Sequence, residues 1–311
     1  MTGQSRFAPD RGLASRMVLT MVLLGLLYVV LMAVLIGALG RGSWPLVIVL
    51  GAVGLWVQWF FSDRVALAGL GGHEVTPEQA PGLHAIIDRL CALADMPKPR
   101  VAIADTDLPN AFATGRSPSR AVVCVTTGLL RRLDRAELEG VLSHELSHVA
   151  HRDVTVMTVA SFVAVLAGFL TRSVLWSGMS GGGLSGGGRG RNDNNTAVAV
   201  LAVLLVSVVV YFLSFILIRT LSRYRELAAD RAGALLTGQP SALASALTKI
   251  NGDMGRIPTR DLRQAEAYNA FFFTPAIAPG FSLSSVFATH PSIEARLDQL
   301  GRISREIGQG R

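Results

Sequence analysis

Two histidines four residues apart, with a glutamate beside the first, form the most reactive pattern in this chain: His144-Glu145-Leu146-Ser147-His148. On an α-helix, positions i and i+4 lie on one face about one turn apart, so both histidines can turn a ring nitrogen toward one metal ion. Glu145 lies about 100° further around the helix, where it can hold a metal-bound water but cannot bind the metal itself. The pattern therefore predicts a metal site with Glu145 as general base.

A helix is expected here on independent grounds. Asp134 is suited to cap its N-terminus, an acidic first turn follows, and apolar residues then recur at helical spacing. Until a third ligand is found, the alternative remains that both histidines are surface residues of an ordinary helix.

The third ligand is predicted on a second helix, within residues 222–230. Hydrolytic zinc sites with two histidines commonly take a glutamate from another helix and leave one position open for water. Glu226 and Asp230 are again four residues apart and share a face. We assign Glu226 as a metal ligand and Asp230 as the acceptor that fixes a histidine ring. The alternative for Glu226 is an exposed carboxylate among arginines.

The composition predicts a membrane protein. Half of the 311 residues are hydrophobic, only 16% are charged, and the mean hydropathy is +0.43, which is too apolar for one soluble domain. Four uncharged runs are long enough to cross a bilayer: residues 17–40, 44–62, 154–171 and 197–218. A cleaved secretory signal is the alternative for the first run, but its apolar core is too long.

Basic residues flank these runs and give the predicted orientation. By the positive-inside rule, the two regions that carry the metal ligands lie in the cytoplasm, and much of the net charge of +7 is explained without a nucleic-acid partner. The expected parts are a cytoplasmic tail (1–16), a transmembrane hairpin (17–62), a first catalytic part (63–153), a second hairpin (154–218) with a Gly-rich external loop (172–196), and a second catalytic part (219–311). The Gly-rich loop lacks a phosphate-binding motif, so no nucleotide is expected.

The first catalytic part is expected to contain a helix at 78–96, three strands at 100–104, 110–114 and 121–126, and then the histidine helix. No stop signal follows His148, so we expect that helix to continue into the third apolar run as one long helix. His151 then points elsewhere on the helix and is placed at the membrane interface. Cys91 and Cys124 are expected to be reduced thiols.

The two halves of the metal site fall at the same depth. If both helices leave the membrane without bending, the midpoint of His144 and His148 lies about 12 Å from the apolar edge at 1.5 Å per residue. Glu226, eight residues beyond Ile218, also lies about 12 Å away. A shared metal ion is therefore possible.

These residues resemble the HtpX group of membrane zinc proteases, relatives of the CAAX prenyl endopeptidases. The resemblance runs from about Leu108 to Leu297, and its motifs are residues 109–115, His144–His148 with Arg152-Asp153, Arg225-Glu226-x-x-Ala229-Asp230, and Thr289-His290-Pro291 followed by Arg296. It implies a predominantly helical α+β zincin-like (gluzincin) catalytic domain with a small sheet, four transmembrane helices and one Zn²⁺ per chain. It also implies an endopeptidase in the cell membrane, with its active site facing the cytoplasm, that acts on misfolded or unassembled membrane proteins.

Two further roles are predicted for hydrolysis by zinc-activated water. His290 is the candidate second donor to the oxyanion, with Arg296 nearby; the alternative is a residue that starts a helix and a structural arginine. The expected edge strand supplies Asn110, Ala111, Phe112 and Ala113 to align an extended substrate, or is simply a strand of the sheet.

Other interpretations stay open at this point. The apolar segment 271–287 either lines a cleft at the membrane surface or covers the site. The rival enzymatic function is processing of one prenylated or signal-derived peptide, and the rival of another class is a catalytically silent membrane scaffold.

Overall fold

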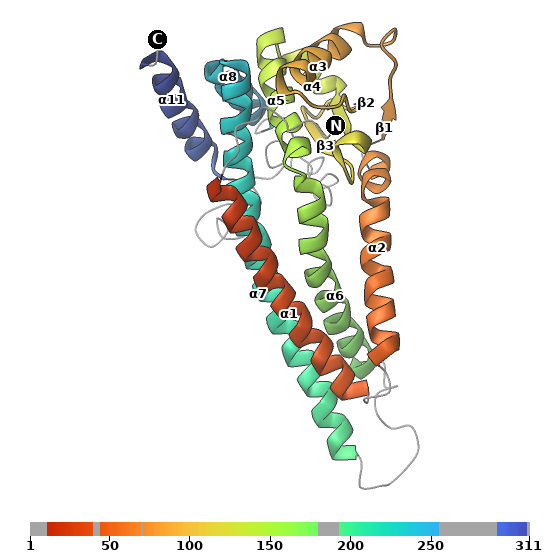
Figure 1. Cartoon of the computed structure of the whole chain (residues 1–311). Coiled ribbons are helices and arrows are strands. Elements are labelled where there is room, and N and C mark those ends of the chain that lie inside the picture. Colours follow the sequence, from red (N-terminus) through yellow and green to blue (C-terminus); the bar gives the residue numbers. More distant parts are fainter. Residues whose placement is uncertain (1–10, 40–43, 70, 180–192, 255–290, 310–311) are drawn as a thin grey trace. The chain divides into compact units, whose positions relative to one another are not determined.

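The computed structural model describes residues 11–39, 44–69, 71–179, 193–254 and 291–309 (Figure 1). The chain divides into two compact units. One contains Phe60–Thr155 and Ser222–Arg311, and the other contains Ser15–Trp59 and Val156–Leu221. His290, the segment 271–287 and the Gly-rich stretch 180–190 lie outside the described residues, so the predictions for them stay open.

Long apolar helices dominate the second unit: α1 (Arg11–Leu39), α2 (Trp44–Gly69), α6 (Asp153–Met179) and α7 (Asp193–Thr237). Within the described residues, three stretches are long and apolar enough to span a membrane, namely Ser15–Ala38, Thr155–Ser173 and Ala197–Thr237. Helix α2 carries a shorter apolar stretch, Ile48–Phe61. The predicted total of four spans therefore remains a prediction.

Helices α1, α6 and α7 pack side by side within this unit (Figure 1). Their shared core contains Leu31, Ala160 and Val210, all nearly inaccessible. Their other faces expose large apolar side chains such as Val29, Phe169 and Val198, each more than half accessible. Exposing so many apolar side chains to water would be costly, so these faces belong in lipid.

The first unit contains a four-stranded sheet in the order β1-β2-β4-β3. Its strands are β1 (Gly72–Glu74), β2 (Arg100–Ala104), β3 (Ala111–Thr114) and β4 (Val122–Thr126); β2 and β4 are parallel, and the two outer pairings are antiparallel. The three predicted strands are confirmed to within a residue, as is the edge position of β3. Strand β1 was missed because its three residues show no apolar alternation.

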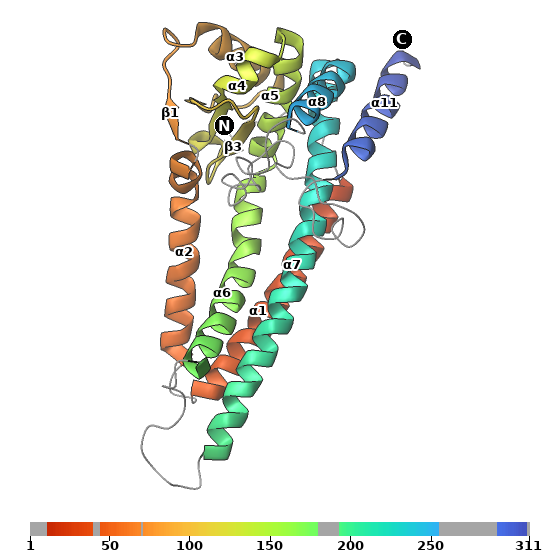
Figure 2. The same ribbon diagram turned by 180° about the vertical axis from the view of Figure 1, so that it is seen from behind.

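The same unit contains the helices α3 (Pro81–Ala94), α4 (Thr127–Arg132), α5 (Arg135–Ala150), α8 (Pro240–Met254), α11 (Ile293–Gln309) and the short 3₁₀ helix η2 (Pro118–Arg120). Helix α5 packs against β3, α3 and α8, and α8 also packs against α11 (Figure 2). The predominance of helix and the small sheet are thus confirmed. Nearly every residue of α5 is buried, including its polar ones, which places the histidine motif inside the unit.

The start of α5 is fixed by a capping box. The Asp134 carboxylate accepts a hydrogen bond from the Glu137 amide, and the Glu137 carboxylate accepts one from the Asp134 amide, both at 2.9 Å. Glu137 also accepts hydrogen bonds from Ser245 (2.6 Å) and Lys249 (2.7 Å) of α8. The predicted cap is confirmed, and it also ties α5 to α8.

The prediction of one long helix from the histidine motif into the third apolar run is wrong. Helix α5 ends at Ala150, His151 is its C-cap, and α6 begins only at Asp153. Arg152, between them, has the left-handed φ of 57°, which interrupts a right-handed helix. A left-handed residue at the end of a helix is usually a glycine, so an arginine at this position did not predict the break. The break lets Asp153 approach the histidine motif.

Candidate metal centre

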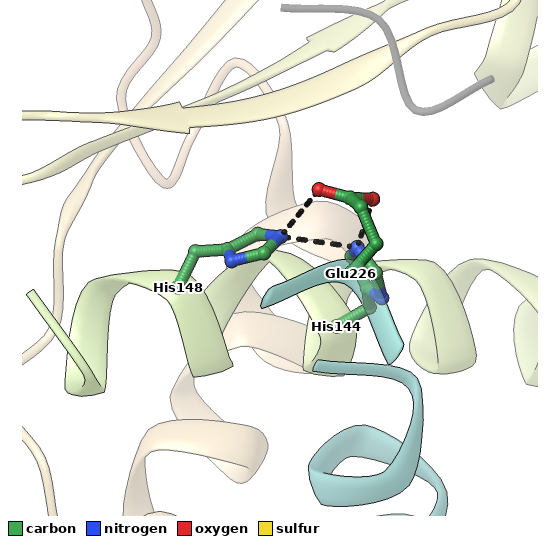
Figure 3. A group of neighbouring side chains, drawn as sticks. All are labelled: His144, His148 and Glu226. Atoms are coloured by element: carbon green, nitrogen blue, oxygen red, sulfur yellow. Dashed lines mark hydrogen bonds and ion pairs between the residues drawn. The ribbon is translucent and has the colours of Figure 1, made fainter. Parts of the chain in front are cut away.

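Three buried side chains converge above one face of α5 (Figure 3). His144 and His148 come from α5, and Glu226 comes from α7. The Nε2 atoms of the two rings are 3.2 Å apart, and each lies 3.5 Å from a Glu226 carboxylate oxygen. All three side chains are less than a tenth exposed. The structure therefore brings together the three residues predicted as metal ligands.

The spacing of these atoms fits a small tetrahedral ion. Zinc binds histidine nitrogen and carboxylate oxygen at about 2.0–2.2 Å, so two ligands of a regular tetrahedron stand about 3.3 Å apart. The two Nε2 atoms are 3.2 Å apart, close to that edge length, and each is 3.5 Å from a different oxygen of the Glu226 carboxylate. Two imidazoles and one carboxylate also form a donor set that leaves a fourth position for water. The residues thus fit a catalytic zinc ion.

Asp230 holds the first of the two rings. Its Oδ1 lies 2.9 Å from the Nδ1 of His144, which directs the Nε2 toward Glu226. Arg296 of α11 donates two hydrogen bonds of 2.7 Å to Asp230, one to each oxygen, and both side chains are almost completely buried. A carboxylate fixed in this way orients the ring and sets its tautomer.

Asp153 holds the second ring in the same manner. Its Oδ2 lies 2.6 Å from the Nδ1 of His148 and 3.1 Å from the Nε of Arg225. Each histidine therefore has an aspartate on Nδ1, and each aspartate has an arginine behind it. The role of Asp153 was not predicted, because in one continuous helix it would lie on a different face from His148. The resemblance had included Arg152-Asp153 among its motifs but had given Asp153 no role.

The charges around the rings favour a cation at their centre. Burial lowers the pKa of His148, but Asp153 and Glu226 outweigh it and raise the pKa to about 10; the pKa of His144 is raised in the same sense by Asp230 and Glu226. Burial would raise the pKa of Asp230, but Arg296 holds it below its ordinary value. Both rings therefore lie in a field that attracts positive charge, which a metal ion can supply in place of protons.

Glu145 lies on α5, directly after the ligand His144. Its side chain is 5% exposed, and burial raises its pKa. Its Oε2 accepts a hydrogen bond of 3.0 Å from the amide of Ala113 in β3. The carboxylate is thus held between the metal centre and the edge strand.

The four residues predicted to align a substrate lie in or beside β3. Ala111, Phe112 and Asn110 are buried, and Ala113 is half-buried. The backbone of Asn110 is bound to Thr126: its amide donates to Thr126 Oγ1, and its carbonyl accepts from the Thr126 amide, both at 2.9 Å. The amide of Ala113 donates a hydrogen bond to Glu145.

A glycine allows the two ligand-bearing helices to approach closely. A Cβ atom added to Gly233 of α7 would lie 2.9 Å from the backbone nitrogen of His144 and 2.8 Å from Ser143 Oγ. Both distances are shorter than a side-chain carbon tolerates. Gly233 is therefore a functional residue that the sequence reasoning missed, since a lone glycine in a helix carries no such signal.

Comparison with known proteins agrees with this geometry. The model of peptidase family M48 matches residues 77–304, which covers strands β2, β3 and β4, the histidine helix, Glu226 and Arg296. The chain belongs to peptidase family M48. It is 60% identical over 306 residues to "Protease HtpX homolog 1" of Streptomyces coelicolor, covering 98% of this chain and 97% of that protein. It is 54% identical over 302 residues to "Protease HtpX homolog" of Moorella thermoacetica, covering 97% and 98%.

One solved structure shares the fold. The crystal structure of S. mikatae Ste24p aligns with a TM-score of 0.51 and 16% identity, covering 89% of this chain and 62% of that one. The predicted resemblance to the HtpX group is confirmed. With its apolar helices, this M48 chain is a membrane-associated protease of the HtpX type.

Proposed function

We propose that this M48 protease is a zinc-dependent endopeptidase with a zincin-like (gluzincin) catalytic domain, in which His144, His148 and Glu226 hold one Zn²⁺ per chain. The observation that supports it best is the convergence of one donor atom from each of these residues within 4.8 Å of the others, all three residues being buried. When bound, the ion supplies Lewis acidity for a water molecule and for the scissile carbonyl.

Each residue of the site has a separate task in this reaction. Glu145 takes the proton of the attacking water and passes it to the leaving amine. Asp230 and Asp153 keep the two histidine rings oriented, and the buried arginines Arg296 and Arg225 keep those aspartates charged. His290 remains the proposed second donor to the oxyanion. Arg296 contacts Asp230 and lies 4.0 Å from Glu226, so it acts through the ligands.

Strand β3 is the proposed alignment site for substrate. It is an edge strand, and its Ala113 amide is bound to the catalytic carboxylate, so a peptide pairing with Ala111–Ala113 would pass beside Glu145. Pairing through backbone groups gives affinity with little sequence selectivity. This supports misfolded or unassembled membrane proteins as substrates, cleaved on the cytoplasmic side of the cell membrane.

The test compares purified wild type with Glu145→Gln and Glu226→Ala, measuring metal content and cleavage of casein. Glu145→Gln should keep its zinc and lose cleavage by about 10²–10⁴-fold, the usual contribution of a general base. Glu226→Ala should lose both zinc and cleavage. Full activity in Glu145→Gln would refute the proposed mechanism.

Substrate choice needs a second measurement. A panel of unfolded membrane proteins should give cleavage at many positions, as expected for quality control. One dominant cleavage position across the panel would instead indicate a processing protease.

A further inference from the structure

A second concave site lies away from the metal centre, beside the β1 edge of the sheet. It is a cavity of about 660 Å³, lined by Leu67 and Ala68 of α2 and by polar residues that include Arg100, Arg116 and Arg120. None of the residues of the metal centre lines it. Its walls thus combine an apolar strip with basic side chains.

Two contacts of Arg116 fix the level of this cavity along the spanning helices. Its guanidinium lies 4.3 Å from the ring centroid of Phe60, in the apolar stretch Ile48–Phe61. Its carbonyl accepts a hydrogen bond of 3.1 Å from Thr155 Oγ1, the first residue of the span Thr155–Ser173. Arg116 therefore lies where two apolar stretches end, which is the level of the lipid headgroups.

Leu67 and Ala68, the apolar residues of the lining, lie further from the hydrocarbon than Arg116 does. Leu67 follows Phe61 by six residues of helix α2, which is a rise of about 9 Å. The headgroup region is about 5–8 Å thick on each side of the hydrocarbon core. The cavity thus begins at the edge of the hydrocarbon and crosses the headgroup layer.

The charge of the lining is positive. Among the lining residues that the structure describes, Arg100, Arg116 and Arg120 accompany one carboxylate, that of Glu74, which pairs with Arg100 at 2.5 Å. Arg100 and Arg120 are exposed, and Arg116 is half-buried with its guanidinium over Phe60. Arginine binds phosphate oxygens through paired N–H donors, and basic side chains at a membrane surface attract anionic lipids.

We propose that this cavity binds the phosphate headgroup of an anionic phospholipid from the surrounding leaflet. Arg116, beside Phe60 at the hydrocarbon edge, and Arg120 contact the phosphate, while the acyl chains stay in the hydrocarbon below them. The position of Arg116 at the ends of two apolar stretches favours a lipid phosphate over a soluble one. The stability of the protease would then depend on the lipid composition of the membrane, whereas hydrolysis at the metal centre would not.

The experiment uses the full chain in nanodiscs of phosphatidylcholine, alone or mixed with phosphatidylglycerol, and in non-ionic detergent. Thermal unfolding and native mass spectrometry report binding of phosphatidylglycerol. Arg120→Gln should weaken that binding about fivefold, the effect of one basic residue at a membrane surface, and Arg116→Gln/Arg120→Gln should abolish the retained lipid. Arg305→Gln, an exposed arginine of α11, loses the same charge and should bind as wild type does.

The outcomes separate the alternatives. Equal losses in Arg120→Gln and Arg305→Gln would show general charge attraction and overturn the site. Equal stabilisation by glycerol 3-phosphate in detergent would show a soluble-anion site and overturn the lipid assignment. Cleavage of a short soluble peptide in detergent should be unchanged in Arg120→Gln; its loss would show that the cavity belongs to the catalytic machinery instead.

Discussion

At the scale of single residues, the metal centre depends on the aspartates that contact the two histidine ligands and on the arginines that contact those aspartates. Each histidine has an aspartate on Nδ1 at 2.9 Å or less, and each aspartate contacts a buried arginine. An ionised aspartate makes the ring a better metal ligand, and the arginine offsets the cost of burying that charge. The two pairs are built from different elements, since Asp230 lies on α7 and Asp153 begins α6.

Asp153 provides the test at this scale. Replacing such a partner of a metal ligand typically lowers metal affinity by about 10- to 100-fold. We expect Asp153→Asn, which keeps an acceptor, to lose about tenfold and Asp153→Ala about a hundredfold. Competition with a chromophoric chelator measures the affinity, and Asp298→Asn on the exposed face of α11 is the control. Wild-type zinc affinity in both Asp153 variants would contradict this role.

The residues found from sequence were those whose partners lie at helical spacing. His144 with His148, and Glu226 with Asp230, are each one turn apart, so a correct helix assignment sufficed to place each pair on one face. Asp153 needs the left-handed Arg152, and Arg296 meets Asp230 only through tertiary packing. Neither relation has a local pattern, so neither could be derived from the sequence.

At the scale of elements, close packing of α5 and α7 brings the two halves of the site together. Gly233 lies two turns beyond Glu226 and faces the backbone of His144. The capping box and the break at Arg152 fix the two ends of α5. The cap was predictable because its hydrogen bonds are local, whereas the break and the short strand β1 depend on the surrounding fold.

Gly233→Ala should separate these helices. The added methyl group would meet backbone at 2.9 Å, where no flexible side chain can yield, and such overpacking costs about 1–3 kcal/mol. Thermal unfolding should show this loss together with weaker zinc binding. Gly301→Ala in α11, where a Cβ meets nothing within 4 Å, should be neutral or stabilising. A Gly233→Ala variant as stable as wild type, with unchanged zinc affinity, would exclude tight packing as the positioning device.

At the scale of the whole molecule, membrane-spanning helices interrupt the catalytic unit in the sequence. The histidine helix and Glu226 are separated by residues 156–221, which belong to the apolar unit, yet they lie within one compact unit. The predicted orientation puts that catalytic unit in the cytoplasm and the loop 172–196 outside.

Labelling with a membrane-impermeant maleimide tests this orientation. The two native thiols, Cys91 and Cys124, are buried, and burial raises the pKa of Cys124 to about 12, so background labelling should be low. In intact cells, Ser185→Cys in the Gly-rich loop should be labelled, and Ser304→Cys on α11 should be labelled only after permeabilisation. The reverse pattern would place the active site outside the cell.

The central claim is that His144, His148 and Glu226 bind one zinc ion. Anomalous diffraction at the zinc edge from crystals of the inactive Glu145→Gln variant tests it most directly. We expect one peak per chain, about 2.0–2.2 Å from both Nε2 atoms and a Glu226 oxygen. A peak elsewhere, or none between these three side chains in zinc-loaded crystals, would contradict the account.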